Sequence, residues 1–112
     1  MGYVRHDAIV CTSFDENYIE PARAKAELLG LPVTDIVKSP VNAYYSFLIA
    51  PDGSKEGWDE SDRGDEARAA WKDWANEQWT TNGLYVYWAH LSYAGDEPTD
   101  TKLVEQAARV DE

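Results

Sequence analysis

The order in which strand-like and helix-like segments alternate constrains the fold of this chain more than any other feature of the sequence. Segments rich in β-branched and aromatic residues lie at 4–12, 33–38, 43–50 and 84–93. Between the first and second of these segments, and between the third and fourth, apolar residues recur at helical spacings of three and four. The sequence therefore predicts the order strand, helix, strand, strand, helix, strand.

The first helix is predicted from one apolar stripe and from residues that start and stop helices. The stripe consists of Ile19, Ala22, Ala26 and Leu29. Ser13 or Asp15 is placed to cap the start of the helix, and Gly30 is a natural left-handed stop. Pro21 lacks a backbone N–H, so we expect the helix either to begin close to it or to bend there.

The second helix is predicted to begin in the acidic run at 59–66, because carboxylates favour the partial positive charge of a helix start. It is expected to end before Gly83. Its broad apolar face is predicted to contain Ala67, Ala70, Trp71, Trp74, Ala75 and either Gln78 or Trp79. Arg68 and Lys72 lie off that face in the helical projection.

The elements together predict an α+β fold, a ferredoxin-like β-α-β-β-α-β two-layer sandwich with an antiparallel sheet, in which the first strand lies between the third and the fourth. A chain of 112 residues is long enough for one hydrophobic core and too short for two. We expect a single domain at residues 1–94, followed at residues 95–112 by an acidic C-terminal linker and a short helix, with the linker at 95–100 and the helix at 102–109. The alternative is an irregular α+β meander built from the same elements.

Acidic residues outnumber basic ones about two to one. The chain has 21 Asp and Glu against 10 Lys and Arg, which gives a formal net charge of −11. Such a charge repels phosphate backbones and anionic lipids, so direct binding to nucleic acid or to a membrane is disfavoured. A protein with a basic surface would be attracted, and salt would weaken that attraction. The same charge also serves solubility.

The sequence predicts no cofactor and no metal site, and it places the protein in a reducing cytoplasm. Cys11 is the only cysteine, so an internal disulfide is ruled out. No apolar run reaches the length of a signal peptide or a membrane span. The acids at 59–66 do not follow calcium-loop spacing. Because glycine-rich phosphate loops and nucleophile elbows are also missing, an enzyme is the less favoured interpretation.

The second face of the predicted sheet is the best candidate binding surface. Two helices can cover only one face, yet bulky side chains occupy both sets of alternate strand positions. Tyrosine buries well and also tolerates water. We therefore predict a contact surface that contains Tyr44, Tyr85, Tyr87 and Tyr93. Either the C-terminal segment folds over this face, or the face serves a partner, with sheet-to-sheet homodimerisation as the common use.

His6 and His90 are the only candidate catalytic residues. If the first and last strands are antiparallel neighbours, the two histidines are expected to lie near each other. The segment that begins at His90, HLS, resembles half of the paired H-x-[ST] motif of two-histidine phosphoesterases, whose histidines act as general acid and base. The other half is absent, because Asp7 and Ala8 follow His6. The alternative is two strand histidines with ordinary hydrogen bonds.

Two blocks, YVRHDAIVCTS at 3–13 and PDGSKEGW at 51–58, resemble small accessory proteins of actinobacterial phages, and the likeness extends to about Trp79. The resemblance implies expression in the cytoplasm of an infected host bacterium and carries no catalytic residues. By analogy, the expected function is non-catalytic: binding a host protein, or sequestering a small signalling ligand, in host takeover or anti-defence. The alternatives are a small nucleotide phosphoesterase that uses His6 and His90, and a structural homo-oligomeric protein.

Overall fold

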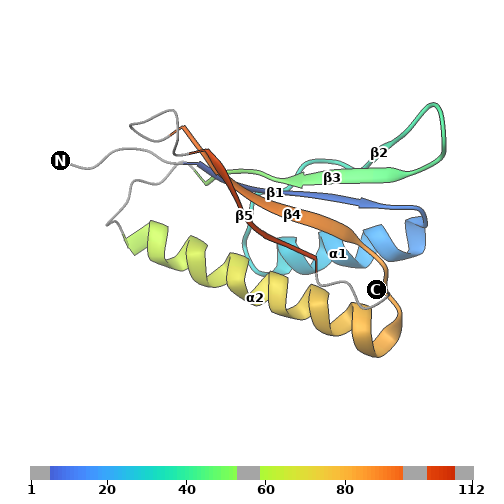
Figure 1. Cartoon of the computed structure of the whole chain (residues 1–112). Helices are drawn as coiled ribbons and strands as arrows, with labels where there is room; N and C mark the ends of the chain where they lie inside the picture. Colours follow the sequence, from blue (N-terminus) through green and yellow to red (C-terminus); the bar gives the residue numbers. More distant parts are fainter. Residues whose placement is uncertain (1–5, 53–58, 95–100, 108–112) are drawn as a thin grey trace.

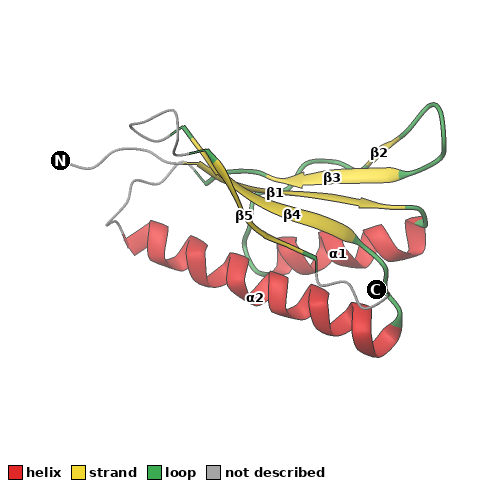
Figure 2. Ribbon diagram, in the orientation of Figure 1, coloured by secondary structure: helices red, strands yellow, loops and turns green. Residues whose placement is uncertain are grey.

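A five-stranded antiparallel sheet with two helices on one of its faces forms the protein (Figures 1 and 2). The computed structural model describes residues 6–52, 59–94 and 101–107. The order of strands across the sheet is β2-β3-β1-β4-β5. In chain order the elements are β1 (His6–Ser13), α1 (Glu16–Leu28), β2 (Val37–Lys38), β3 (Tyr45–Ile49), α2 (Asp59–Asn82), β4 (Tyr87–Tyr93) and β5 (Lys102–Gln106).

Strand β1 is the centre of the sheet and pairs antiparallel with β3 on one side and β4 on the other. Ile9 lies opposite Ile49 of β3 and opposite His90 of β4. The absence of Gly and Pro from β1 suits a strand whose backbone groups are bonded on both sides. The prediction that the first strand lies between the third and the fourth is confirmed.

Helix α1 begins and ends where the sequence signals indicate. Asp15 is the N-cap, and its Oδ1 accepts a hydrogen bond from the backbone N–H of Asn17 at 2.9 Å. Gly30, with φ of 84°, adopts the left-handed conformation just after the helix. The helix begins five residues before Pro21, so the expectation of a start close to that proline is wrong.

The core lies between the helices and the sheet. Ile9, Cys11, Ile49 and Trp71 are all at most 1% exposed. Trp71 of α2 packs edge-on against Trp88 of β4, with ring centroids 5.9 Å apart. Its indole Nε1 also donates to the backbone oxygen of Ala22 at 2.9 Å, which links α2 to α1.

The C-terminal segment corrects the prediction of a helix at 102–109. Residues 102–106 form β5, which pairs antiparallel with β4, with a register shift between His90 and Leu91. The N–H of Ala107 donates to the oxygen of Trp88 at 2.9 Å. The backbone N–H and C=O groups along the edge of β4 are available to form hydrogen bonds with this segment. The hydrogen bonds of the resulting strand pair stabilise the extended conformation more than the weak helical pattern of apolar residues stabilises a helix. The sheet thus has one strand more than the four-stranded ferredoxin-like plan, and residues 108–109 lie outside the described part of the chain.

Candidate functional site

The face of the sheet that points away from the helices is left uncovered by α1, α2 and β5 (Figure 1). Successive strand residues point to opposite faces, and Ile9 and Cys11 of β1 belong to the core on the helix side. Their neighbours in β1, and the residues paired with those neighbours, therefore share the other face. We call this surface the open face; on the three central strands it consists of His6, Ala8, Val10, Thr12, Ser46, Leu48, Tyr87, Ala89, Leu91 and Tyr93.

The open face carries no Asp, Glu, Lys or Arg on its three central strands, although 28% of the chain is charged. Val10, on the central strand, is 43% exposed, and Tyr87 is 44% exposed. Strand β5 extends the sheet sideways beside β4, so the described part of the C-terminal segment does not fold over this face. The face is buried at Ala8, with 4% of the residue exposed, and its other members on these strands are partly or largely exposed. The arrangement is a partly exposed, uncharged surface on an otherwise strongly acidic protein.

A shallow hollow of about 190 Å³ lies on the sheet where β1 meets β4. It is lined by Val10, Thr12, Tyr87, Trp88 and Ala89. Beside it, the hydroxyl groups of Thr12 and Ser46 are hydrogen-bonded across the strands at 2.9 Å. The hollow has room for about one large side chain of a partner molecule.

The four tyrosines predicted to form one contact surface are divided by the structure. Tyr93 lies on the open face, and strand register assigns Tyr87 to the same face. The ring of Tyr87 also lies 5.3 Å from that of Trp79 of α2, so this side chain contacts the helix side as well. Tyr85 precedes β4, and its ring lies 5.1 Å from that of Trp79 and 6.0 Å from that of Tyr18, among the helix side chains. Tyr44 precedes β3, and its N–H is bonded to Asn42 within the loop after β2. The alternation of β4 indicates Tyr87 and Tyr93, whereas Tyr85 falls just outside the strand.

His6 and His90 lie on opposite faces of the sheet, which corrects the expectation that they form a pair. His6 is opposite Tyr93, and their rings lie 5.5 Å apart on the open face. His90 precedes Tyr93 by three residues in the same strand, so its side chain points to the helix side. A single substrate atom cannot reach both rings, and the geometry needed for a two-histidine acid–base mechanism is absent.

His90 is one member of a buried polar network under α2. Its Nδ1 lies 2.8 Å from Nζ of Lys72, and its Nε2 lies 3.0 Å from Oδ1 of Asp7. The Nζ of Lys72 also lies 2.8 Å from Oε1 of Glu105 in β5. Because both ring nitrogens are engaged, His90 has no nitrogen left to exchange a proton with a substrate in this arrangement. The network connects β1, α2, β4 and β5.

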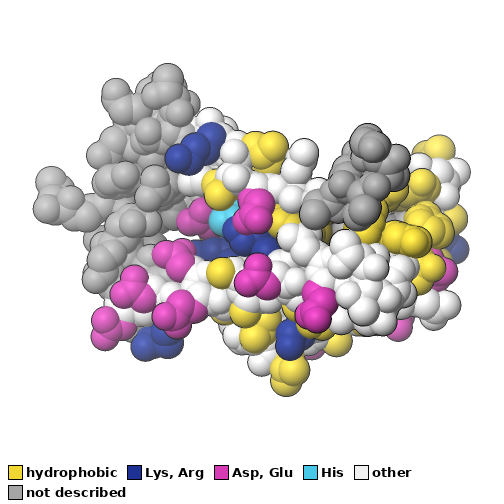
Figure 3. Space-filling model, turned by 60° about the horizontal axis from the view of Figure 1, so that its bottom comes forward, with side chains coloured by type: hydrophobic (Ala, Val, Ile, Leu, Met, Phe, Trp, Pro, Cys, Tyr) yellow, Lys and Arg dark blue, Asp and Glu magenta, His cyan; other side chains and the backbone are white. Residues whose placement is uncertain are grey.

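Arg68 extends this network by one helical turn and faces three carboxylates. Its guanidinium pairs with Asp7 of β1 at 3.9 Å, with Asp52 at 3.5 Å, and with Asp65 of its own helix. The side chain of Arg68 is only 5% exposed, and that of Lys72 only 11%. Figure 3, which looks toward the helices, shows a histidine, basic groups and acidic groups meeting in one place.

The burial of Arg68 and Lys72 corrects the expectation that they lie off the buried face of the second helix. Ala70, which was assigned to that face, is exposed. Arg68 and Lys72 can be buried because each has polar partners: Arg68 pairs with Asp7, and Lys72 contacts Glu105 and His90. These partners are far away in the sequence. Within the described ranges, no buried side-chain nitrogen or oxygen lacks a hydrogen-bond partner.

Neither Cys11 nor a metal cluster supplies a reactive centre in the described part of the chain. Burial raises the pKa of the Cys11 thiol well above its ordinary value, so the nucleophilic thiolate is disfavoured. Among residues 6–52, 59–94 and 101–107, no group of three or more metal-ligating side chains lies together. No helix in those ranges is long and apolar enough to cross a membrane.

Comparison with known proteins adds no further assignment. A scan against protein-family models found no match, and searches among curated proteins and among solved structures found none either.

Proposed function

We propose that this protein is a non-catalytic binding protein whose open face docks a partner protein with a basic surface. The observation that carries the proposal is the uncharged open face, which no helix or strand of the described residues covers, on a chain of net charge −11. The centres of protein interfaces are depleted in charged residues and enriched in aromatic ones, because charges are costly to remove from water. The hollow beside Val10 and Tyr87 offers a place for one anchoring side chain of the partner.

Charge complementarity favours a basic partner over a second copy of the chain. A second copy brings another net charge of −11 to the contact, so long-range repulsion opposes association. A basic protein gains from the same field, which raises the rate of encounter. The uncharged open face would then form the desolvated centre of the contact, and the acidic surface around it would select the partner.

The resemblance to small accessory proteins of actinobacterial phages supplies the setting for this proposal. The partner is then a protein of the host bacterium, and its occupation by the phage protein is the function. A ferredoxin-like assignment of the fold belongs to the same proposal: β1 to β4 would be the four strands of that plan, and β5 an addition at the edge.

Capture from an actinobacterial lysate on the immobilised protein tests the proposal when two matched variants are compared. Val10→Lys places a charge in the middle of the open face, whereas Val41→Lys places the same charge in the loop after β2, where the side chain is 90% exposed. We expect a basic protein to be retained by the wild type and by Val41→Lys, and to be lost with Val10→Lys. The captured protein is then purified, and its affinity for the three chains is measured by calorimetry at low and high salt.

Each result of this comparison decides for or against the proposal. Equal affinity of the captured protein for the Val10→Lys and Val41→Lys variants would show that the open face is not the contact. An acidic captured protein, or affinity independent of salt, would contradict the choice of a basic partner. A stable dimer of the wild type in light scattering that Val10→Lys dissociates would replace the basic partner with a second copy.

A further inference from the structure

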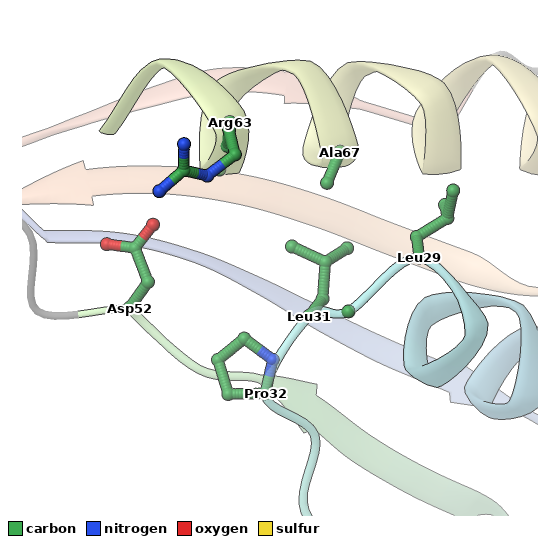
Figure 4. Close-up of a pocket in the computed structure, with 8 residues that line it drawn as sticks. Leu29, Leu31, Pro32, Asp52, Arg63 and Ala67 are labelled. Atoms are coloured by element: carbon green, nitrogen blue, oxygen red, sulfur yellow. The ribbon is translucent and has the colours of Figure 1, made fainter. Parts of the chain in front are cut away.

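A second hollow, on the helix side of the molecule, lies between the end of α1 and the first half of α2. Its volume is about 330 Å³, within the range of roughly 300–1,000 Å³ that small-molecule sites occupy. The hollow is separate from the open face, so its role does not depend on the function proposed above. Figure 4 shows the side chains around it.

The floor and walls of this hollow are aliphatic. Leu31 is buried at its base, with 5% of the residue exposed. Leu29, Pro32 and Ala67 surround it. These side chains offer no hydrogen-bonding groups, so they suit the hydrocarbon part of a ligand.

One end of the hollow carries two opposite charges. Arg63 reaches in from α2 and Asp52 from the segment after β3, and Figure 4 shows their charged groups turned toward each other. A guanidinium group binds a carboxylate through paired donors, and a carboxylate accepts from an ammonium group. The pair has no net charge, so a ligand that is itself neutral overall meets no repulsion there.

The position of Asp52 depends on a glycine inside α2. A Cβ atom at Gly64 would collide with Oδ2 of Asp52, so with any other residue at position 64 this carboxylate would have to move from its present position against the helix. Glycine is unfavourable in a helix interior, and its presence here is explained by that close approach. Arg68, at 3.5 Å from the same oxygen, holds Asp52 from the core side. The carboxylate of Asp52 therefore lies against one helix, α2, at Gly64 and Arg68.

We propose that this hollow binds a small zwitterion with an aliphatic side chain, that is, an apolar α-amino acid. The carboxylate of the ligand pairs with Arg63, its ammonium group pairs with Asp52, and its side chain lies on Leu29 and Leu31. A dianionic phosphate compound fits poorly, because Asp52 would face it. The chain thereby has a ligand site apart from its protein-binding surface.

Calorimetric titration with L-leucine tests the proposal, with three analogues that each lack one recognised feature. 4-Methylpentanoate lacks the ammonium group, 3-methylbutylamine lacks the carboxylate, and glycine lacks the side chain. We expect saturable binding of L-leucine and markedly weaker binding of all three analogues. No saturable binding of L-leucine, or equal binding of 4-methylpentanoate, would overturn the assignment.

Variants then locate the binding in the hollow. Arg63 is exposed, so Arg63→Gln is expected to leave the fold intact and to weaken L-leucine binding by about tenfold or more, as the loss of a charge-assisted hydrogen bond does. Asp52→Asn and Gly64→Ala are expected to act in the same direction. Lys102→Gln, which removes an exposed positive charge from β5, is the control and should bind as the wild type does. Equal affinities for Arg63→Gln and Lys102→Gln would contradict the proposal.

Discussion

Lys72 donates a hydrogen bond to Nδ1 of His90 across 2.8 Å, beneath helix α2. An ammonium group can only donate, so this contact makes Nδ1 an acceptor and leaves the imidazole proton on Nε2, which donates to Asp7. The two residues are 18 positions apart, and their contact joins α2 to β4. The histidine thus serves as a connector between a buried cation and a partly buried carboxylate.

Lys72→Met tests the contribution of this contact to stability. We expect the free energy of unfolding to fall by about 1–3 kcal/mol, because His90 loses its donor and Glu105 loses its cation. Urea denaturation measures the change. Lys38→Met removes an exposed lysine from β2 and should change stability by less than about 0.5 kcal/mol. Equal effects of the two substitutions would contradict a structural role for the network.

Arg68→Met is expected to destabilise the protein more than any substitution of an exposed arginine. The guanidinium faces three carboxylates, and its removal leaves Asp7 and Asp52 without this cation, at a cost of about 3–5 kcal/mol. Arg68→Lys should recover only part of the loss, since an ammonium group lacks the planar fork of donors. Arg63→Met, on the exposed side of the same helix, is the matched comparison in thermal unfolding. Similar melting temperatures for Arg68→Met and Arg63→Met would refute this account.

Ala107→Pro tests how β5 is attached to β4. The N–H of Ala107 donates to the oxygen of Trp88, and proline removes this donor, so we expect a loss of about 1–3 kcal/mol. Amide hydrogen exchange of β5 should become faster at the same time. Ala107→Gly keeps the N–H and removes the methyl group, which separates the hydrogen bond from side-chain burial. Unchanged exchange in β5 of the proline variant would show that the strand is held by other contacts.

The buried thiol of Cys11 predicts a loss of stability in alkaline solution. Burial raises the pKa of Cys11 in the folded state above its value in the unfolded chain, about 8.5. The contribution of the protonated thiol is therefore complete below the unfolded pKa and is lost as pH rises through the folded pKa. We expect the stability of the wild type to fall more steeply above about pH 8.5 than that of Cys11→Ala. Urea denaturation at several pH values measures both slopes, and parallel slopes would contradict the prediction.

The local features of the fold could be predicted because each rests on residues close together in the chain. The cap at Asp15 and the stop at Gly30 depend on side-chain and backbone chemistry within one turn. The pairing of β1 with β3 and β4 followed from the order of elements and from the rules for crossover connections. The helix predicted at 102–109 failed because the ladder with β4 is a tertiary interaction that no local spacing reveals.

The candidate sites were harder to predict, since their members come from distant parts of the chain. Asp7, Lys72, His90 and Glu105 meet only after the sheet has formed, and no motif connects them. The open face was anticipated as a surface, but Tyr85 was misplaced because β4 starts two residues after it. The hollow between the helices has one sequence signal, Gly64 within a helical segment, and its meaning depends on where Asp52 lies.

The two outer strands of the sheet determine which kind of association is open to the molecule. At one border β2 is only two residues long and ends in Lys38. At the other border β5 carries Lys102 and Glu105. Short and charged outer strands hinder the addition of a further strand from a neighbouring molecule. Lateral growth into fibrous aggregates is thus discouraged on both sides, and recognition is left to the broad surfaces of the sheet and helices.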